Sequence, residues 1–281
     1  MTRTAILLTV LVLVPTFSPL KALSLADTAQ HFDHSHSALD NLLQNHVRDG
    51  RVDYKGFISS RKAFEQYINE LGDADGSFSD WSSNEKLAFW INAYNAFTIK
   101  AIIDNYPIKK GFFISLYPAN SIRQIDGVWD KLTFRAAGKT VTLNDIEHQI
   151  LRKEFSEPRI HFAIVCASVG CPELRSEAYM ADKVQEQLEQ AARDFVNNPQ
   201  KVLIDPEKRA VKLSKIFKWF GEDFIRESGT VGHFKNRNPR DRAVLNFVMT
   251  YIEEDRLKSF LEGNRFKVSY LKYDWSLNNQ A

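Results

Sequence analysis

The chain has 281 residues and a formal net charge of +2, with 37 Lys and Arg residues against 35 Asp and Glu residues. This length is enough for one large domain with a substantial apolar core. The near balance of positive and negative charge gives no reason to expect a nucleic acid or a membrane surface as the partner of this protein.

Residues 1–26 are predicted to be a secretory signal peptide. Arg3 provides a positive start, residues 5–14 form a short apolar run, and Ser24-Leu25-Ala26 fits a cleavage site. The apolar run is too short to predict a membrane span, and no later run approaches membrane length. We therefore expect residues 27–281 to form one exported globular domain, periplasmic or extracellular, with no membrane contact in the mature form.

Helices and short hairpins alternate irregularly along the rest of the chain. Apolar spacing predicts helices over 39–47, 61–71, 85–105, 143–154, 181–196, 215–225 and 239–252. Turn residues between short alternating runs predict a hairpin of 131–135 with 140–142, another of 201–204 with 210–213, and a last strand over 266–273. This irregular alternation favours an α+β domain, with a central buried helix and a mixed sheet, over a doubly wound fold.

The helix over 85–105 is predicted to be that central buried helix. Ser82 and Glu85 have the spacing of a capping box, and apolar residues then cover nearly every face. Asn92 and Asn95 lie three residues apart on one side of it, and buried amides require hydrogen-bond partners. They either fix neighbouring loops or face a polar pocket.

The helix over 143–154 contains a carboxylate inside its apolar face. Glu147 lies four residues after Leu143 and four residues before Leu151. An inward carboxylate costs several kcal/mol, of the order of the usual burial penalty, unless a partner satisfies it. Because this helix leads directly to His161, we expect Glu147 and His161 to be buried and hydrogen-bonded to each other.

The segment 158–174 contains both cysteines of the chain. Its apolar block over 160–165 predicts an interior strand in which His161 is the single ionisable side chain. Gly170 allows a tight backbone, left-handed conformations included, and Pro172 suits the first position of a helical turn. Cys171 would then lie at a helix N-terminus, where partial positive charge favours a thiolate.

The first hypothesis is a cysteine hydrolase or acyl-transferase of the Cys-His-acid type that acts on peptide, amide or ester bonds. Cys171 is the nucleophile, His161 accepts its proton, and Glu147 orients the imidazole. Along the chain these residues occur in the order Glu, His, Cys, which is permuted relative to papain. A permuted papain-like architecture would therefore fit. The candidates for the oxyanion donor are Asn92, Asn95 and the backbone at Gly170. The substrate would be peptide-like or a small molecule.

Two alternatives remain open beside the enzyme. Cys166 and Cys171 can form a structural disulfide, which is expected in an oxidising compartment. The domain would then be a module that binds a peptide or a partner without turnover. A redox enzyme is disfavoured because four residues lie between the cysteines (C-x4-C), in place of the C-x2-C spacing. The sequence has no metal-ligand spacing, phosphate loop or dinucleotide fingerprint, so neither a metal site nor a cofactor is predicted.

Several motifs together resemble one family, the domain of unknown function 547 (DUF 547). The matching pieces are VDYKGF at 52–57, KLAFWINAYNAFTI at 86–99, TLNDIEHQILR at 142–152, HFAIVCASVGCPELR at 161–175, LSKIFKWFGEDF at 213–224 and YDWSLN at 273–278. The pieces occur in order over almost the whole mature chain. The resemblance implies one globular domain of a kind common in exported bacterial proteins, and it brings no established reaction.

Overall fold

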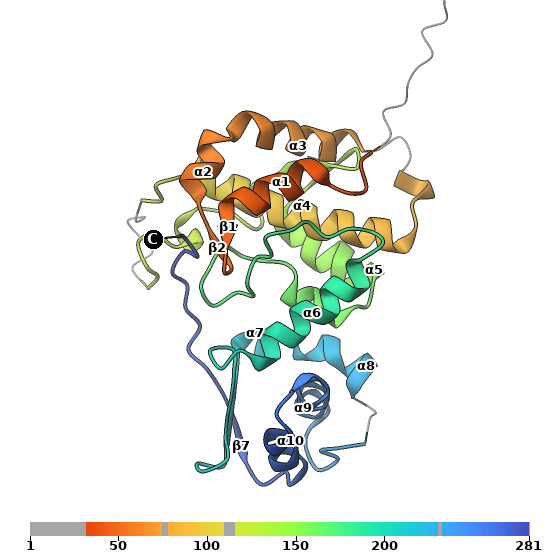
Figure 1. The fold of residues 1–281 in the computed structure, drawn as a ribbon, viewed down its shortest axis with the longest axis vertical. Helices are drawn as coiled ribbons and strands as arrows, with labels where there is room; N and C mark the ends of the chain where they lie inside the picture. The colour runs from red at the N-terminus through yellow and green to blue at the C-terminus, as the bar shows by residue number, and fades with distance from the viewer. Residues whose placement is uncertain (1–31, 75–77, 110–115, 230–231, 281) are drawn as a thin grey trace, which may run out of the picture. The chain divides into compact units, whose positions relative to one another are not determined.

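The structure is a computed structural model that describes residues 32–74, 78–109, 116–229 and 232–280. The predicted signal peptide, 1–26, lies outside the described residues. The described residues belong to one compact unit that spans His31–Ala281. Its architecture is α+β, as predicted: most of its elements are helices (Figure 1), and the described strands form three small sheets. Within the described part of the chain, no helix combines the length and apolar character needed to cross a bilayer.

The first elements form a helical layer with one short hairpin. They are α1 (Ser37–His46), β1 (Val47–Arg48), β2 (Arg51–Val52), α2 (Tyr54–Ser59), α3 (Arg61–Asp73) and η1 (Phe78–Asp80). The central helix α4 (Ser83–Asp104) follows and packs against α2, α3 and α6. The predicted capping box is confirmed, since the Ser82 side chain accepts from the Glu85 N–H and the Glu85 carboxylate accepts from the Ser82 N–H. Nearly all of α4 is buried, so its prediction is confirmed.

The middle of the chain packs against α4 through η3 and α6. Its elements are η2 (Ile122–Gln124), β3 (Phe134–Ala136), β4 (Lys139–Val141), η3 (Asp145–Leu151), α5 (Arg152–Glu154), η4 (Pro158–Phe162) and α6 (Val184–Asn197). β3 and β4 pair in antiparallel fashion, which confirms the first hairpin. The predicted helix over 143–154 is present, but η3 is a wider π-helix, a form that often occurs at functional sites.

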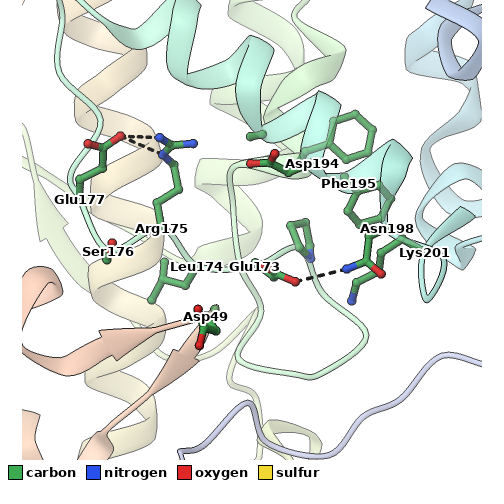
Figure 2. Close-up of a pocket in the computed structure, with 14 residues that line it drawn as sticks. Asp49, Glu173, Leu174, Arg175, Ser176, Glu177, Asp194, Phe195, Asn198 and Lys201 are labelled. Atoms are coloured by element: carbon green, nitrogen blue, oxygen red, sulfur yellow. Dashed lines mark hydrogen bonds and ion pairs between the residues drawn. The ribbon is translucent and has the colours of Figure 1, made fainter. Parts of the chain in front are cut away.

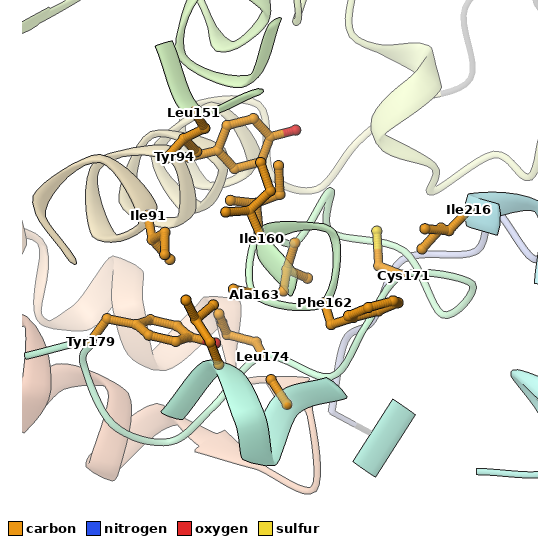
Figure 3. Packing of buried hydrophobic residues seen from close by; sticks show 14 of the residues in the cluster. Ile91, Tyr94, Leu151, Ile160, Phe162, Ala163, Cys171, Leu174, Tyr179 and Ile216 are labelled. Atoms are coloured by element: carbon orange, nitrogen blue, oxygen red, sulfur yellow. The ribbon is translucent and has the colours of Figure 1, made fainter. Parts of the chain in front are cut away.

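The strand predicted over 160–165 is wrong. Residues 158–162 form the 3-10 helix η4, which starts at Pro158 and is capped by the side chain of Glu157. A short continuous apolar run is compatible with either a buried strand or a buried helical turn, and here Pro158 favours the turn. Figure 3 shows Ile160 and Phe162 packed among buried residues of neighbouring segments, with α4 contributing Ile91 and Tyr94.

The last third of the chain holds the three-stranded sheet. Its elements are β5 (Val202–Asp205), β6 (Ala210–Leu213), α7 (Lys215–Phe220), η5 (Gly221–Phe224), α8 (Ile225–Ser228), α9 (Pro239–Tyr251), α10 (Asp255–Glu262) and β7 (Lys267–Tyr270). β5 and β6 are antiparallel, which confirms the second hairpin, and β7 adds in parallel to β6. The last strand is confirmed but is shorter than predicted.

After β7 the chain returns to the segment that carries the cysteines. Figure 1 shows this stretch running from β7 back toward β1 and β2. The Gly170 N–H donates to the Asp274 carbonyl at 2.7 Å, and the Val169 N–H donates to the Ser276 carbonyl at 2.8 Å. Residues about 100 positions apart along the chain therefore form one wall, and this wall places Tyr273 beside the cysteines.

Candidate functional site

The three predicted catalytic residues line one cavity of about 200 Å³, which we call the central pocket. Glu147 comes from η3, His161 from η4 and Cys171 from the loop that follows. The remaining wall is largely aromatic, with the side chains Tyr94, Trp129, Trp219, Phe220, Tyr273 and Trp275. Segments far apart in the sequence thus bring ionisable groups together among aromatic side chains, where electrostatic interactions are stronger than in open solvent.

His161 is held by Asp223 and not by Glu147, so the predicted Glu147–His161 hydrogen bond is wrong. The Nε2 atom of His161 lies 2.7 Å from the Oδ2 atom of Asp223 in η5. The imidazole also stacks on Phe220, with ring centroids 4.1 Å apart. Because η4 is helical, its side chains do not alternate between two faces as those of a strand do, and His161 faces α7 and η5.

The Asp223 carboxylate is fixed by a second partner, Arg152. The guanidinium donates to both carboxylate oxygens, at 2.6 Å and 2.7 Å. Burial opposes ionisation of Asp223, but the hydrogen bonds from His161 and Arg152 outweigh it and lower the pKa of the carboxyl group. Asp223 is therefore a carboxylate at neutral pH, and the pair with Arg152 is bidentate.

The partners of His161 determine its tautomer. Burial lowers the pKa of His161, and the hydrogen bond with Asp223 offsets this only in part, so the ring is neutral at pH 7. A carboxylate can only accept, so Nε2 carries the proton and Nδ1 carries the lone pair. Among the described residues no hydrogen bond is made by Nδ1, and the side chain is buried. It is thus a neutral base on a side chain that lines the central pocket.

Glu147 is buried, as predicted, with 8 % of its surface exposed. Its Oε2 atom accepts a hydrogen bond from the Tyr94 hydroxyl at 3.1 Å. Burial raises the pKa of Glu147 to about 7, although the Tyr94 hydrogen bond and the charge of Arg152 act in the opposite direction. Near neutral pH, about half of the molecules would therefore carry a proton on Glu147.

Cys166 and Cys171 form a disulfide, with their Cα atoms 6.1 Å apart, and the described residues contain no free cysteine. Three donors also converge on the Sγ atom of Cys171. These are the Cys166 N–H at 2.9 Å, the Tyr273 hydroxyl at 3.2 Å and the Ser168 hydroxyl at 3.4 Å. The sulfur therefore lies in a polar environment at the wall of an aromatic pocket.

The helical turn predicted at Pro172 is wrong, because residues 172–183 contain no helix. The next helix, α6, begins only at Val184. Leu174 instead forms an antiparallel bridge with Gly50 at the turn between β1 and β2, which holds this part of the loop in an extended form. Cys171 thus receives no help from a helix N-terminus, and the hydrogen-bond donors around its sulfur are the groups that can stabilise a thiolate.

The predicted oxyanion donors Asn92 and Asn95 are both used to fix neighbouring loops. Asn92 exchanges two hydrogen bonds with the backbone of Tyr179, at 2.7 Å and 3.0 Å. Asn95 donates to the Ala163 carbonyl at 3.0 Å and accepts from the Val165 N–H at 2.8 Å. Neither amide lines the central pocket. From α4 the two amides instead fix the backbone before and after the loop that contains Cys166 and Cys171.

The backbone at Gly170 is also engaged, so the third predicted oxyanion donor is wrong as well. Its N–H is bonded to the Asp274 carbonyl. Gly170 does not use the left-handed conformation that glycine allows, since its φ is not positive. A Cβ atom there would lie 2.8 Å from the ring of Tyr273 and 2.9 Å from the Asp274 carbonyl. Glycine is required because two backbone segments approach closely.

Replacing Asn95 with alanine is expected to lower the free energy of unfolding by about 2–4 kcal/mol, since both partners stay buried without a hydrogen bond. Urea unfolding monitored by circular dichroism measures the change. Asn105→Ala is the matched control, because that side chain bonds only to the Ala101 carbonyl at the end of the same helix. Equal loss of stability in the two variants would contradict a role of Asn95 in fixing the loop.

Several residues of the site were missed from the sequence. Asp223 lies 62 residues from His161, and nothing in its local pattern indicates a partner. Asn144 lines the central pocket from the start of the η3 segment, and no side-chain hydrogen bond occupies its amide among the described residues. The one available signal was that GEDF at 221–224 belongs to a motif that resembles the family. Among the described residues, no group of three or more His, Cys, Asp or Glu side chains is placed to hold a metal ion.

A second, larger cavity of about 400 Å³ contains none of the acid–base groups named above. Two of its acidic side chains have partners in the cavity wall (Figure 2): Glu177 pairs with Arg175, and Glu173 accepts a hydrogen bond from the Asn198 amide. Lys201 lies at its edge and donates to the Val169 and Cys171 carbonyls, each at 2.6 Å. This lysine therefore stabilises the loop of Cys166 and Cys171 from outside the central pocket. Because the larger cavity contains none of the acid–base groups, we place the candidate site in the smaller one.

Comparison with known families confirms the resemblance over part of the chain. The family model described as "Protein of unknown function, DUF547" matches residues 78–196. The search of curated proteins and the search of solved structures found no match. The matched segment contains Glu147, His161 and both cysteines, whereas Asp223 and Tyr273 lie beyond its end. The permuted papain-like architecture remains a prediction.

Proposed function

Since residues 78–196 match the DUF547 family, whose description carries no activity, we propose a function from the central pocket itself. The protein is a thiol-dependent hydrolase or acyl-transferase that acts on ester, amide or peptide bonds once the Cys166–Cys171 disulfide is reduced. The observation that carries this proposal is the His161–Asp223 pair, which leaves Nδ1 of His161 free in the same pocket as Cys171.

In the proposed reaction a dithiol first reduces the disulfide by thiol–disulfide exchange. The S–S bond between Cys166 and Cys171 breaks and both become thiols, while the two sulfurs of the reagent form a disulfide. Nδ1 of His161 then accepts the proton of Cys171, and the thiolate attacks the carbonyl carbon of the substrate. The leaving group takes the proton from Nδ1, and an acyl-enzyme remains. Water, deprotonated by His161, releases the acid in hydrolysis, and another acceptor replaces water in transfer.

Asp223 takes the role that the sequence assigned to Glu147. It keeps Nε2 protonated and stabilises the imidazolium when Nδ1 takes the proton. The three donors around Cys171 favour the thiolate, because hydrogen bonds to a charged form lower its pKa. Asn144 replaces Asn92 and Asn95 as the proposed oxyanion donor, since its amide lines the pocket. A protonated Glu147 supplies a second donor in the same cavity.

One observation favours a second function. The disulfide between Cys166 and Cys171 fits the alternative of a non-catalytic module that binds a peptide or partner in the central pocket. It also supports the proposal that a bacterium exports this protein to the periplasm or the medium, because disulfides persist in oxidising compartments. The two functions differ in one respect, which is whether Cys171 reacts when it is a free thiol.

Hydrolysis of p-nitrophenyl acetate by wild type, Cys166→Ser and Cys171→Ser, each with and without dithiothreitol, tests the proposed function. Wild type is expected to turn over many times per molecule only after reduction. Cys166→Ser is expected to be active without a reductant, because Cys171 then has no disulfide partner. Cys171→Ser is expected to be inactive in both conditions. Thermal melts of all three confirm that they are folded.

Alkylation by iodoacetamide at pH 6.5 provides a readout that does not depend on the choice of substrate. If His161 activates Cys171, the thiol in Cys166→Ser should react at least about tenfold faster than the thiol in Cys171→Ser. Equal alkylation rates without turnover would reject the hydrolase and favour the binding module. Turnover by Cys171→Ser equal to that of reduced wild type would reject the thiol mechanism.

A further inference from the structure

Arg123 lies at the wall of the central pocket, in η2, and its guanidinium is held by aromatic rings. The guanidinium carbon is 4.6 Å from the ring centre of Tyr117, 5.3 Å from that of Trp129 and 5.1 Å from that of Trp275. One N–H also donates to the Tyr117 hydroxyl at 3.0 Å. Such stacking orients the planar group and leaves its edge available for other partners.

No carboxylate among the described residues pairs with Arg123. Its single hydrogen bond uses one of the five N–H groups that a guanidinium offers. The other ionisable groups of the pocket already have partners: Glu147 is bonded to Tyr94, and His161 to Asp223. Burial lowers the pKa of His148, so that ring is neutral at pH 7. Arg123 is thus the fixed positive charge of the described pocket.

The shape of the pocket limits what can satisfy this charge. A cavity of about 200 Å³ accepts only a small group, and its walls Trp219, Phe220 and Tyr273 favour a flat or apolar body. The fork of a guanidinium matches a carboxylate through two parallel hydrogen bonds. A phosphate dianion would call for a second cation, and the described lining of the pocket offers none.

We propose that Arg123 makes the central pocket selective for small apolar or aromatic compounds that carry a carboxylate. This inference extends the proposed function, and its consequence for substrate choice depends on that function. The hydrolase would act on acyl compounds with a free carboxylate near the scissile bond. Arg123 determines specificity and takes no part in the proton transfers. Binding itself requires no reaction, so it can be measured on the oxidised protein.

Tryptophan fluorescence of the full chain, titrated with phenylacetate and with its neutral analogue phenylacetamide, tests the inference, since Trp129, Trp219 and Trp275 line the pocket. Wild type is expected to bind phenylacetate at least about tenfold more tightly than phenylacetamide. Arg123→Gln is expected to lose this preference, and Arg123→Lys to keep only part of it, because lysine lacks the fork. Arg256→Gln, on the exposed surface of α10, is the charge-matched control and should behave as wild type.

Equal affinity of wild type for the acid and the amide would overturn the inference, and so would the absence of phenylacetate binding or tighter binding of phenyl phosphate. These outcomes need only wild-type protein, so they hold even if an Arg123 variant fails to fold. Failure of the hydrolase is distinguishable, because it abolishes turnover and leaves the preference for phenylacetate intact. A preference that survives in folded Arg123→Gln would place the anion site elsewhere.

Discussion

Replacing Asp223 with asparagine is expected to reduce the turnover of p-nitrophenyl acetate by the reduced protein about 10³–10⁴-fold. The amide has no charge to stabilise the imidazolium that forms when His161 takes the proton of Cys171. Arg152 can only donate hydrogen bonds, so it keeps the oxygen of the new asparagine side chain as its acceptor. The NH₂ group of the asparagine is then directed toward His161. The proton then moves from Nε2 to Nδ1, and the base at Nδ1 is lost.

The matched control for this variant is Glu222→Gln. Glu222 is the neighbour of Asp223 in η5 and pairs with Arg240 at the surface, with 63 % of its side chain exposed. This variant is expected to keep the turnover of wild type. Thermal melts of both variants separate loss of chemistry from loss of structure. If folded Asp223→Asn keeps turnover within about threefold of wild type, the proposed role of the His161–Asp223 pair is wrong.

The stability of wild type is expected to depend on the ionisation of Glu147. As the pH rises from 4.5 to 7, the unfolding free energy of wild type should fall by about 3 kcal/mol relative to that of Glu147→Gln. Burial raises the pKa of this carboxyl from 4.5 to about 7 in the folded state. Between these values the folded chain keeps a proton that the unfolded chain has lost, so rising pH favours unfolding. Below pH 4.5 both states are protonated and the effect of Glu147 is fully stabilising.

The comparison with Glu147→Gln is essential because buried histidines act in the opposite direction. Burial lowers the pKa of His36 from 6.5 to about 3, so this residue adds stability as pH rises through that range. Glutamine copies the protonated carboxyl and leaves the histidines unchanged, so the difference isolates Glu147. Urea unfolding at pH 4.5, 5.5, 7 and 8.5 measures it, with Glu207→Gln in an exposed turn as the control. Parallel stability curves for wild type and Glu147→Gln would contradict a raised pKa.

Local patterns in the sequence predicted most of the elements. The helix α4 begins at a capping box and is apolar all round, and both properties are encoded within about 20 residues. The two hairpins follow from turn residues between short alternating runs. The burial of Glu147 follows from helical periodicity alone, because its neighbours at four residues on either side are leucines. These are short-range properties, so the sequence was sufficient for them.

Local patterns in the sequence could not predict the backbone conformation around His161. The apolar run over 160–165 is too short for its periodicity to distinguish a buried strand from a buried helical turn. The surrounding structure decides: the amide of Asn95 bonds to the backbone at Ala163 and Val165 and holds the chain after η4 in place. The same contacts explain why this amide fixes a loop and is not available to a substrate.

The partners within the site were decided by the tertiary structure. Asp223 reaches His161 across 62 residues, and Tyr273 reaches Cys171 across 102 residues. A hydrogen bond of this kind depends on how η4, η5 and the segment after β7 pack together, and neither the spacing nor the chemistry of the residues specifies that packing. The sequence by itself therefore indicated which groups require partners, Glu147 and His161 above all, whereas only the folded chain determined that those partners are Tyr94 and Asp223.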